Sequence, residues 1–427
     1  MALYNLEFIV NLARNFSPFY AKLYHSVSKA NPQLTDLPII DLNNYNKANN
    51  PQNNQLITIH PPSGIVIKSG ATTGIPKITI YTVEEWKFLA QIIAELEAQM
   101  GLFVQGDRLL ELLGAGHLYG GLILAHDTQM FRSQQVLLYL QGGDSSVTEI
   151  IELIREFNIN VVDAVPQVLA DIVTEIKENG PKEIKLEKFL YGGDSMLQEQ
   201  YELIKEVFPQ AIVTGNAYAS SDAGFIGFAL NDCEVNQFHT YPNYAAVEIV
   251  DDKGQLINDP YVPGRIITTN FSRLLMPVLR YPTGDRGFWL EADKVPNRKL
   301  QVSGRDIAKD RMISLANNQL LINESILNKI IRGSYHAKIS VYQIEINEVN
   351  GIDQLKIKIV LKDENPEDKR LIEKELDQKI YQKNPKFYEL VSAGKINPLI
   401  IEFVSSKELS FNSITRKLLR IKDNRQI

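Results

Sequence analysis

The segment Ser69–Lys77, SGATTGIPK, combines hydroxyl side chains, glycines and a lysine in one loop directly after an expected strand. Glycine lets backbone N–H groups approach a ligand closely, hydroxyls donate hydrogen bonds, and lysine supplies positive charge. The combination suits a polyanion. It differs from a Walker A loop, because Gly70 and Gly74 are too close together and Lys77 does not follow the second glycine. A polar surface turn is the alternative interpretation.

Two further polar segments also follow expected strands. They are Tyr191–Asp194, YGGD, and Asn216–Asp222, NAYASSD. Ligands of open α/β sheets bind beyond the carboxyl ends of the strands, so all three loops are expected to meet at one crevice. Tyr218 offers a flat face for a base, and Asp222 an oxygen ligand for Mg²⁺ beside phosphates. Taken singly, each segment is equally well explained as a turn or as packing.

Three more segments lie towards the C-terminus. In Arg280–Asp285, RYPTGD, a carboxylate at a tight turn can accept both hydroxyls of a ribose. Gly304–Asp306, GRD, stands where the sequence pattern changes. Asn412–Arg420, NSITRKLLR, carries Lys417 in a basic cluster. Alone, these segments are also typical of a surface turn, a linker turn and a solvated tail.

Alternating strand and helix patterns must position the first three loops. A possible capping box, Thr82 and Glu85, opens a helix that runs to about Met100. The alternation predicts βαβ units and a mainly parallel sheet. Strands are expected at Gly64–Lys68, Arg108–Leu113, Gln135–Leu140, Asn160–Ala164, Glu187–Leu190 and Ala211–Thr214. Helices are expected at Val147–Phe157, Pro166–Glu178 and Tyr201–Val207.

The pattern changes after about residue 240 and again near Arg305. Strands without long intervening helices predict a β-rich subdomain: Ala245–Val250, Gly264–Asn270 and Val278–Tyr281. The rest reads as a small α+β unit: strands Ala337–Glu348 and Gln354–Leu361 joined at an Asn350-Gly351 turn, helix Pro366–Gln382 and strand Leu399–Val404. We expect an α/β fold with a large N-terminal body over residues 1–305 and a mobile C-terminal lid over 306–427.

The N-terminal region adds an amphipathic helix within Met1–Ala30 and an asparagine-rich stretch, Asp41–Gln55, expected to be an exposed connection. No run of eighteen apolar residues occurs, so no membrane partner is expected and a cytoplasmic location fits. A net charge of -6 argues against a nucleic-acid partner. The single cysteine, Cys233, excludes an internal disulfide framework.

The six segments occur in an order that resembles the adenylate-forming superfamily of acyl-CoA synthetases, adenylation domains and luciferases. The resemblance extends from about residue 64 to residue 420. The short N-terminal part and the total length look most like the phenylacetate-CoA ligase branch. Its implied chemistry is attack of a carboxylate on the α-phosphorus of ATP with Mg²⁺, then transfer of the acyl group to a thiol of CoA or of a carrier protein.

The resemblance also implies a role for individual residues. Those matching the nucleotide-binding residues of the family are Ser69, Thr72, Thr73 and Lys77 for the phosphates, Gly193, Asp194 and Tyr218 for adenine, Ser221 for the α-phosphate, and Asp285 with Arg305 for the ribose. Asp222 matches the Mg²⁺ ligand. Lys417 matches the lysine that contacts the carboxylate and α-phosphate. His117 falls where the family has a gate at the acyl pocket, or is an ordinary packed histidine.

Departures from the family pattern concern the second half-reaction most. Either Asp306 or Asp310 could correspond to the aspartate at the hinge between the two domains of the family. Leu315–Asn318 stands where the family pattern has Arg-Gly. Rivals therefore remain: a synthetase that passes the acyl group to a protein or amine without CoA, or a catalytically reduced nucleotide-binding homologue. The substrate is expected to be an aryl or medium acyl acid, with candidate pocket residues Tyr119–Leu124, Val165 and Asn216–Ala217. Whether the chain forms a homodimer stays open.

Overall fold

The computed structural model describes most of the chain. The described residues are 3–27, 31–69, 77–142, 145–180, 183–305, 312–316, 319–323, 326–327, 330–331, 338–361, 365–411 and 418–425. They fall into two compact units. Unit 1 holds the described residues up to 196 and from 200 to 305, and unit 2 holds residues 197–199 and those beyond 305.

A five-stranded sheet in the order β6-β3-β7-β8-β9 forms one half of unit 1, and all of its neighbouring strands run parallel. The predicted parallel sheet is therefore confirmed. Its strands are β3 (Arg108–Glu111), β6 (Leu137–Leu140), β7 (Val161–Ala164), β8 (Lys188–Tyr191) and β9 (Ile212–Gly215). Its helices are α4 (Val83–Met100), α5 (Gly121–Gln129), α6 (Val147–Glu156), α7 (Pro166–Asn179) and α8 (Gln198–Val207).

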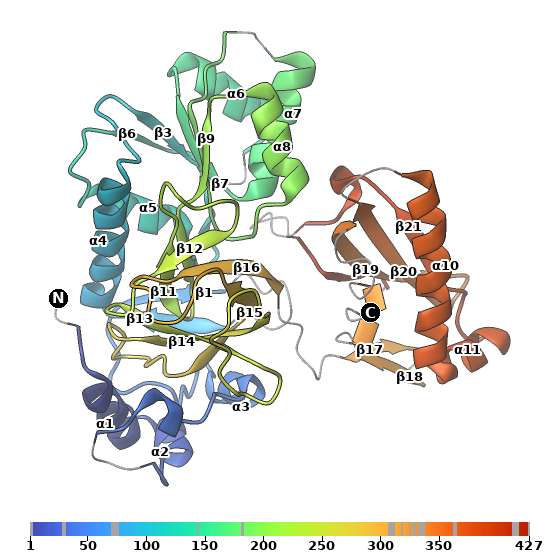
Figure 1. Ribbon diagram of the computed structural model, residues 1–427, viewed down its shortest axis with the longest axis horizontal. Helices are drawn as coiled ribbons and strands as arrows, with labels where there is room; N and C mark the ends of the chain where they lie inside the picture. The colour runs from blue at the N-terminus through green and yellow to red at the C-terminus, as the bar shows by residue number, and fades with distance from the viewer. Residues whose placement is uncertain are drawn as a thin grey trace. The chain divides into compact units, whose positions relative to one another are not determined.

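Helices cover both faces of this sheet (Figure 1). Successive strand residues point to opposite faces, and the residues on each face are apolar and pack against helices. Residues of one face join the core of α6, α7 and α8: Leu110, Val162 and Phe189. Their chain neighbours join the core of α4: Leu109, Val161 and Leu190. Both faces are apolar, as a buried parallel sheet requires. Because the strands run parallel, their carboxyl ends lie at the same edge of the sheet.

Helix α4 begins and ends as its sequence predicts. The Thr82 side chain accepts from Glu85 N, and the Glu85 carboxylate accepts from Thr82 N, so the predicted capping box is confirmed. The helix ends at Gly101, which has a left-handed φ of 64°. Glu85 also accepts the backbone N–H groups of Leu274 and Leu275, which joins this helix start to the second sheet of unit 1.

The second sheet is antiparallel, in the order β10-β11-β12-β16-β15-β14-β13, and it confirms the predicted β-rich part. Its strands are β10 (Ala217–Ser220), β11 (Gly224–Phe228), β12 (Gln237–Thr240), β13 (Ala245–Val250), β14 (Gly264–Asn270), β15 (Tyr281–Trp289) and β16 (Lys299–Arg305). It begins before residue 240, and the strand expected at Val278–Tyr281 is wrong. Arg280 has a φ of 44° that breaks the extended run, so β15 begins at Tyr281.

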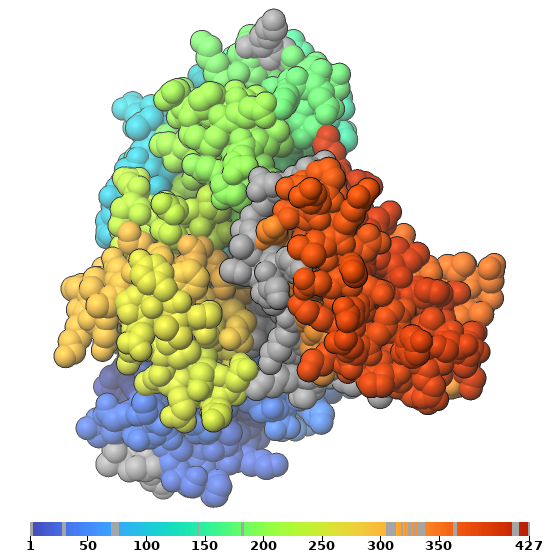
Figure 2. Space-filling model, turned by 45° about the vertical axis from the view of Figure 1, so that its right-hand side comes forward, coloured from blue at the N-terminus to red at the C-terminus, as the bar shows by residue number. Residues whose placement is uncertain are grey.

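Helical segments of the N-terminal region pack against this second sheet, as Figures 1 and 2 show. They are α1 (Leu6–Phe16), α2 (Pro18–Leu23), η1 (Leu34–Asp36) and α3 (Leu42–Ala48). The exposed connection expected over Asp41–Gln55 is wrong in part: Asp41 caps α3, and Tyr45 and Ala48 are buried. A small hairpin, β1 (Ile65–Lys68) with β2 (Ile78–Tyr81), flanks the predicted phosphate loop.

Unit 2 is an α+β unit around a four-stranded sheet in the order β21-β20-β19-β22. Asn350 and Gly351, at φ values of 55° and 74°, form the predicted turn between the two long strands. Its elements are β17 (Met312–Leu315), β18 (Leu320–Asn323), β19 (Ile339–Val349), β20 (Ile352–Leu361), α10 (Pro366–Lys383), α11 (Pro385–Ser392), β21 (Ile400–Phe403), η2 (Ser406–Glu408) and β22 (Ile421–Asp423). Among the described helices of either unit, none combines the length and apolar character that a membrane crossing needs.

Candidate functional site

The base of the predicted phosphate loop is closed by two hydrogen bonds between its first and last residues. Ser69 N donates to the Lys77 carbonyl at 3.0 Å, and Lys77 N donates to Ser69 Oγ at 3.0 Å. Ser69 and Lys77 are thus held side by side at the ends of β1 and β2. Thr72 and Thr73 lie outside the described residues.

The Lys77 ammonium group lies in a nearly buried polar cluster. Its Nζ is 2.8 Å from Asp222 Oδ2 and 2.5 Å from the Tyr281 hydroxyl, which also donates to Asp222 Oδ2. Ser220 Oγ donates to the other carboxylate oxygen, Asp222 Oδ1, at 2.8 Å. The side chains of Asp222 and Lys77 are 8% and 21% exposed. The turn between β10 and β11, the start of β15 and the end of the phosphate loop therefore meet at one carboxylate.

The electrostatics of the cluster keep Asp222 ionised. Burial by itself would raise the pKa of Asp222, but the Lys77 charge and hydrogen bonds from Lys77, Tyr281 and Ser220 hold that pKa well below its usual range. Burial, and then the Asp222 charge, raise the pKa of Tyr281 well above its usual range. At neutral pH the Asp222 carboxylate is thus ionised and the Tyr281 phenol is neutral.

Two members of this cluster were missed by the sequence reasoning. Ser220 contacts the Asp222 carboxylate, and the carbonyl of the neighbouring Ser221 accepts from the Tyr81 hydroxyl at 3.0 Å. The α-phosphate role of Ser221 stays a prediction. Tyr281 lies within the RYPTGD segment, but only Asp285 was selected there. A hydroxyl two residues before the acid, and a tyrosine in a segment already singled out, were the available signals.

A second polar pair joins the predicted adenine and ribose residues. The Tyr218 hydroxyl donates to Asp285 Oδ2 at 2.6 Å, and its ring stacks on Phe238 with centroids 5.2 Å apart. Asp285 and Arg305 are backbone partners on the adjacent strands β15 and β16. The fold thus brings Tyr218, Asp285 and the Arg305 backbone to one place, and Phe238 covers one face of the tyrosine ring.

Gly193 and Asp194 lie at the carboxyl end of β8. Gly193 has a φ of 79°, which favours glycine, and Asp194 is exposed and accepts from Ser195 N at 2.9 Å. On the neighbouring strand, Gly215 pairs with Tyr191 and leads into Asn216. The YGGD and NAYASSD segments therefore leave adjacent strand ends, as the sequence predicts for parallel strands.

His117 is exposed at the tip of a small hairpin between β4 (Ala115–Gly116) and β5 (Tyr119–Gly120). His117 and Leu118 both have positive φ values, 46° and 67°. The Leu118 carbonyl accepts from Lys68 N at 2.9 Å, which ties the tip to the residue before Ser69. The structure thus places His117 near the phosphate loop. The gate role stays a prediction.

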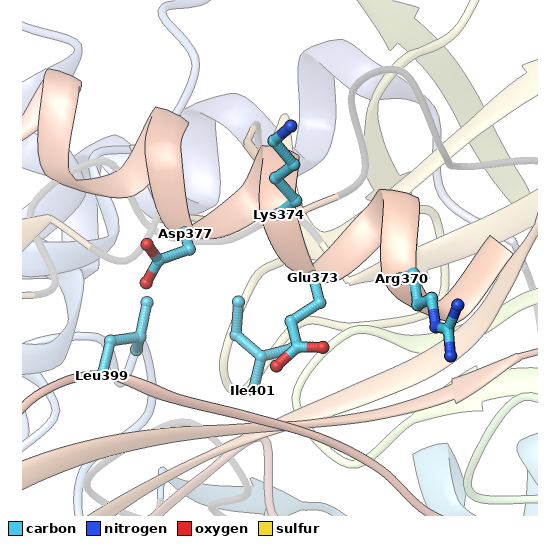
Figure 3. A pocket seen from close by; sticks show the side chains of 6 residues that line it. All are labelled: Arg370, Glu373, Lys374, Asp377, Leu399 and Ile401. Atoms are coloured by element: carbon cyan, nitrogen blue, oxygen red, sulfur yellow. The ribbon is translucent and has the colours of Figure 1, made fainter. Parts of the chain in front are cut away.

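Several predicted residues fall outside this description. Lys417, Asp306 and Asp310 lie outside the described residues, and of Arg305 only the backbone is described. Unit 2 contains a groove of about 320 Å³ between α10 and β21, shown in Figure 3. It is lined by Arg370, Glu373, Lys374, Asp377, Leu399 and Ile401, none of which is a predicted site residue.

The chain is similar in sequence to known ligases. The chain is 24% identical over 323 residues to a phenylacetate-coenzyme A ligase of Pseudomonas putida, covering 73% of this chain and 67% of that relative. A shorter match, 25% identical over 134 residues and 31% of each chain, is to an indoleacetate–lysine synthetase of Pseudomonas savastanoi. No family model matches the chain.

The similarity in three dimensions covers nearly the whole chain. A crystal structure of 2-hydroxyisobutyryl-CoA ligase, in the postadenylation state with R3-HIB-AMP, superposes with a TM-score of 0.62 at 15% identity, covering 98% of this chain and 88% of that chain. This fold and the sequence relatives define the class: the chain is an adenylate-forming ligase. Within that class, its sequence is similar to phenylacetate-CoA ligases.

Proposed function

We propose that this chain activates a carboxylic acid with ATP, forming an acyl-adenylate and pyrophosphate, and then transfers the acyl group to the thiol of CoA. The observation that carries the proposal is the buried Lys77–Asp222–Tyr281 cluster at the end of the phosphate loop. On this fold, a lysine held at that point supplies fixed positive charge beside the expected triphosphate. The relation to a phenylacetate-CoA ligase supports the same reaction.

The first half-reaction joins two anions, so charge must be neutralised before they approach. A carboxylate oxygen bonds to the α-phosphorus, and the bond from that phosphorus to the bridging oxygen breaks, with pyrophosphate leaving. Lys417 is proposed to contact the carboxylate and α-phosphate, and the phosphate loop to hold the leaving group. Asp285 accepts the ribose hydroxyls, and the second face of the Tyr218 ring receives adenine.

The residues around Asp222 also fit a Mg²⁺ ion that accompanies ATP. Oδ2 accepts from Lys77 and Tyr281, whereas within the described residues Oδ1 accepts one hydrogen bond, from Ser220. Oδ1 therefore keeps a lone pair for a cation. Mg²⁺ typically uses one or two carboxylates together with substrate phosphates. Bound there, the ion would neutralise phosphate charge.

An aryl acid is the proposed substrate class, supported by the phenylacetate-CoA ligase relative. The candidate pocket includes Val165, which is buried at the start of α7, and Tyr119 to Leu124 beside the His117 hairpin. These side chains are mostly apolar, which suits a ring more than a charged side chain.

The acyl acceptor has a second candidate. The match to an indoleacetate–lysine synthetase favours, for that stretch, an enzyme that joins an acid to an amine. A carrier-protein thiol is a third possibility within the same chemistry. CoA, an amine and a carrier-protein thiol would each give a different product from the same acyl-adenylate, so the product identifies the acceptor.

The deciding experiment has two stages. Carboxylate-dependent exchange of pyrophosphate into ATP, measured over a panel of aryl, fatty and amino acids, identifies the acid. With that acid, product formation is then compared for CoA, a pantetheinylated carrier protein and lysine. We expect exchange with an aryl acid and formation of acyl-CoA. Absence of exchange with every acid would instead support a catalytically reduced homologue.

A further inference from the structure

Three potential metal ligands gather in unit 1, apart from the nucleotide residues described above. Asp232 and Cys233 lie in the loop between β11 and β12, and His239 lies on β12. Their ligand atoms all lie within 4.8 Å of one another. His239 Nε2 is 2.8 Å from Asp232 Oδ1, and Cys233 Sγ is 4.0 Å from the same oxygen. Sulfur, nitrogen and oxygen donors thus surround one point.

The imidazole ring of His239 is oriented for metal binding by a contact on its far side. Its Nδ1 lies 2.7 Å from the Asn297 carbonyl oxygen, and a carbonyl can only accept, so Nδ1 carries a proton. Nε2 faces the Asp232 carboxylate and carries a second proton, which a metal ion would displace. Nε2 is therefore the nitrogen directed at Asp232 and Cys233. Histidine ligands of metals almost always donate their other N–H to such an acceptor, which fixes the tautomer. The His239 side chain is only 13% exposed, so this orientation is held by packing.

Lys299 lies near the cluster but on the opposite carboxylate oxygen. Its Nζ is 2.9 Å from Asp232 Oδ2, whereas His239 and Cys233 approach Oδ1. A cation at Oδ1 would leave the Lys299 contact in place, and the ammonium fixes the carboxylate plane. Lys299 thus orients the acid from behind, at the cost of some repulsion towards the cation.

We propose that Asp232, Cys233 and His239 bind a divalent metal ion of the zinc type, with a fourth position open to water. Thiolate and imidazole favour Zn²⁺ over Mg²⁺ or Ca²⁺, which prefer oxygen. Binding releases the protons of the Cys233 thiol and of His239 Nε2 to solvent, and no electron is transferred. Ligand atoms around zinc are about 3.5 Å apart, given bonds of about 2.0–2.3 Å. Side-chain rotations that move the Cys233 sulfur and the Asp232 carboxylate oxygen by about 1 Å would therefore bring the three ligand atoms to the spacing that zinc requires.

The metal would stiffen a loop that supports the nucleotide residues. Within that loop, Asn236 N donates to the Tyr191 hydroxyl at 2.8 Å, directly before Gly192. Phe238, the neighbour of His239, stacks on Tyr218. A metal held by Asp232, Cys233 and His239 would therefore act through the positions of Tyr191 and Phe238.

Cobalt titration of the untagged, chelator-treated full chain tests the proposal. Because Cys233 is the single cysteine of the chain, a thiolate-to-cobalt charge-transfer band can come from no other side chain. We expect one Co²⁺ per chain with that band, and its displacement by Zn²⁺. Cys233→Ser abolishes the band, and His239→Gln weakens Zn²⁺ binding about tenfold or more in calorimetry.

His126→Gln is the matched control, since His126 also lies 2.9 Å from an aspartate, Asp127, without a cysteine in that pair. It should leave the band and the zinc affinity unchanged. Circular dichroism of each metal-free variant checks that the fold is retained. The proposal is overturned if the wild-type chain shows no charge-transfer band with Co²⁺. It is equally overturned if His239→Gln binds zinc as tightly as the wild type.

Discussion

Lys77 and Asp222 form an ion pair with an N···O distance of 2.8 Å, although 145 residues separate them in the chain. The pair joins the end of the phosphate loop to the turn between β10 and β11. Because Asp222 is buried, its charge depends on this one ammonium and on the hydroxyls of Tyr281 and Ser220. The phosphate loop and the expected magnesium ligand are therefore a single electrostatic unit.

Replacing Lys77 by methionine should destabilise the fold as well as impair nucleotide binding. The substitution leaves the Asp222 carboxylate buried without its counter-charge, which costs about 2 to 4 kcal/mol of the free energy of unfolding. Urea unfolding of Lys77→Met, Asp222→Asn and the double variant measures the coupling between the two residues. We expect the double variant to be less destabilised than the sum of the single variants.

Lys68→Met is the control for this cycle. Lys68 lies one residue before Ser69, with its ammonium 4.9 Å from the Tyr119 ring centroid. Its loss should change the free energy of unfolding by less than about 1 kcal/mol. Strict additivity in the Lys77 and Asp222 cycle would contradict the ion pair as a stabilising contact.

Replacing Asp285 by alanine should weaken ATP binding about tenfold or more, since a charged acceptor for the ribose hydroxyls is lost. Tyr218→Phe removes the hydroxyl that donates to Asp285 but keeps the ring stacked on Phe238. Its effect on ATP affinity should be smaller than that of Asp285→Ala. Calorimetry with ATP measures both, and an unaltered affinity in Asp285→Ala would rule out the ribose assignment.

Replacing Lys417 by alanine should slow acyl-adenylate formation by about a hundredfold or more, or about 3 kcal/mol in the activation free energy. ATP binding should be nearly unchanged, because the phosphate loop and Asp285 remain. The readouts are carboxylate-dependent pyrophosphate exchange and ATP calorimetry on the same sample. A normal exchange rate in this variant would remove Lys417 from the catalytic residues.

Stability should fall as the pH rises towards neutrality, because two buried carboxyls are register partners on β3 and β7. Burial raises the pKa of Asp163 to about 7, with the Glu97 charge adding to the shift, and burial with the Asp163 charge raises that of Glu111. Between about pH 4 and 7 the folded state thus binds more protons than the unfolded state. Folding therefore loses free energy as the pH rises through this range.

Asp163→Asn should remove part of this pH dependence. The measurement is the midpoint of urea unfolding at several pH values between about 4.5 and 8, because these groups titrate over that range. The advantage of the variant over the wild type should grow with pH. Asp259→Asn, at an exposed position, should run parallel to the wild type. Parallel profiles for Asp163→Asn and the wild type would disprove the raised pKa.

The periodicity of the chain sufficed to locate most secondary structure. Helix α4 with its Thr82–Glu85 box, the Asn350-Gly351 turn and the strands of the parallel sheet lie within a few residues of their predicted bounds. These features depend on residues three to ten apart, so a single sequence contains them. The strand predicted over residues 278–281 is wrong because Arg280 adopts a positive φ, which the spacing of apolar residues does not reveal.

The order of the polar segments along the chain was enough to name the residue types that a nucleotide site needs, because each motif is local. Their partners are not local. The fold adds Ser220 and, from 59 residues away, Tyr281 to the Asp222 carboxylate, and it packs Phe238 against Tyr218. Cys233 matched no motif, and its neighbours Asp232 and His239 form a cluster only through the turn into β12. Such contacts arise from strand pairing and packing over long separations, which no local pattern in one sequence records.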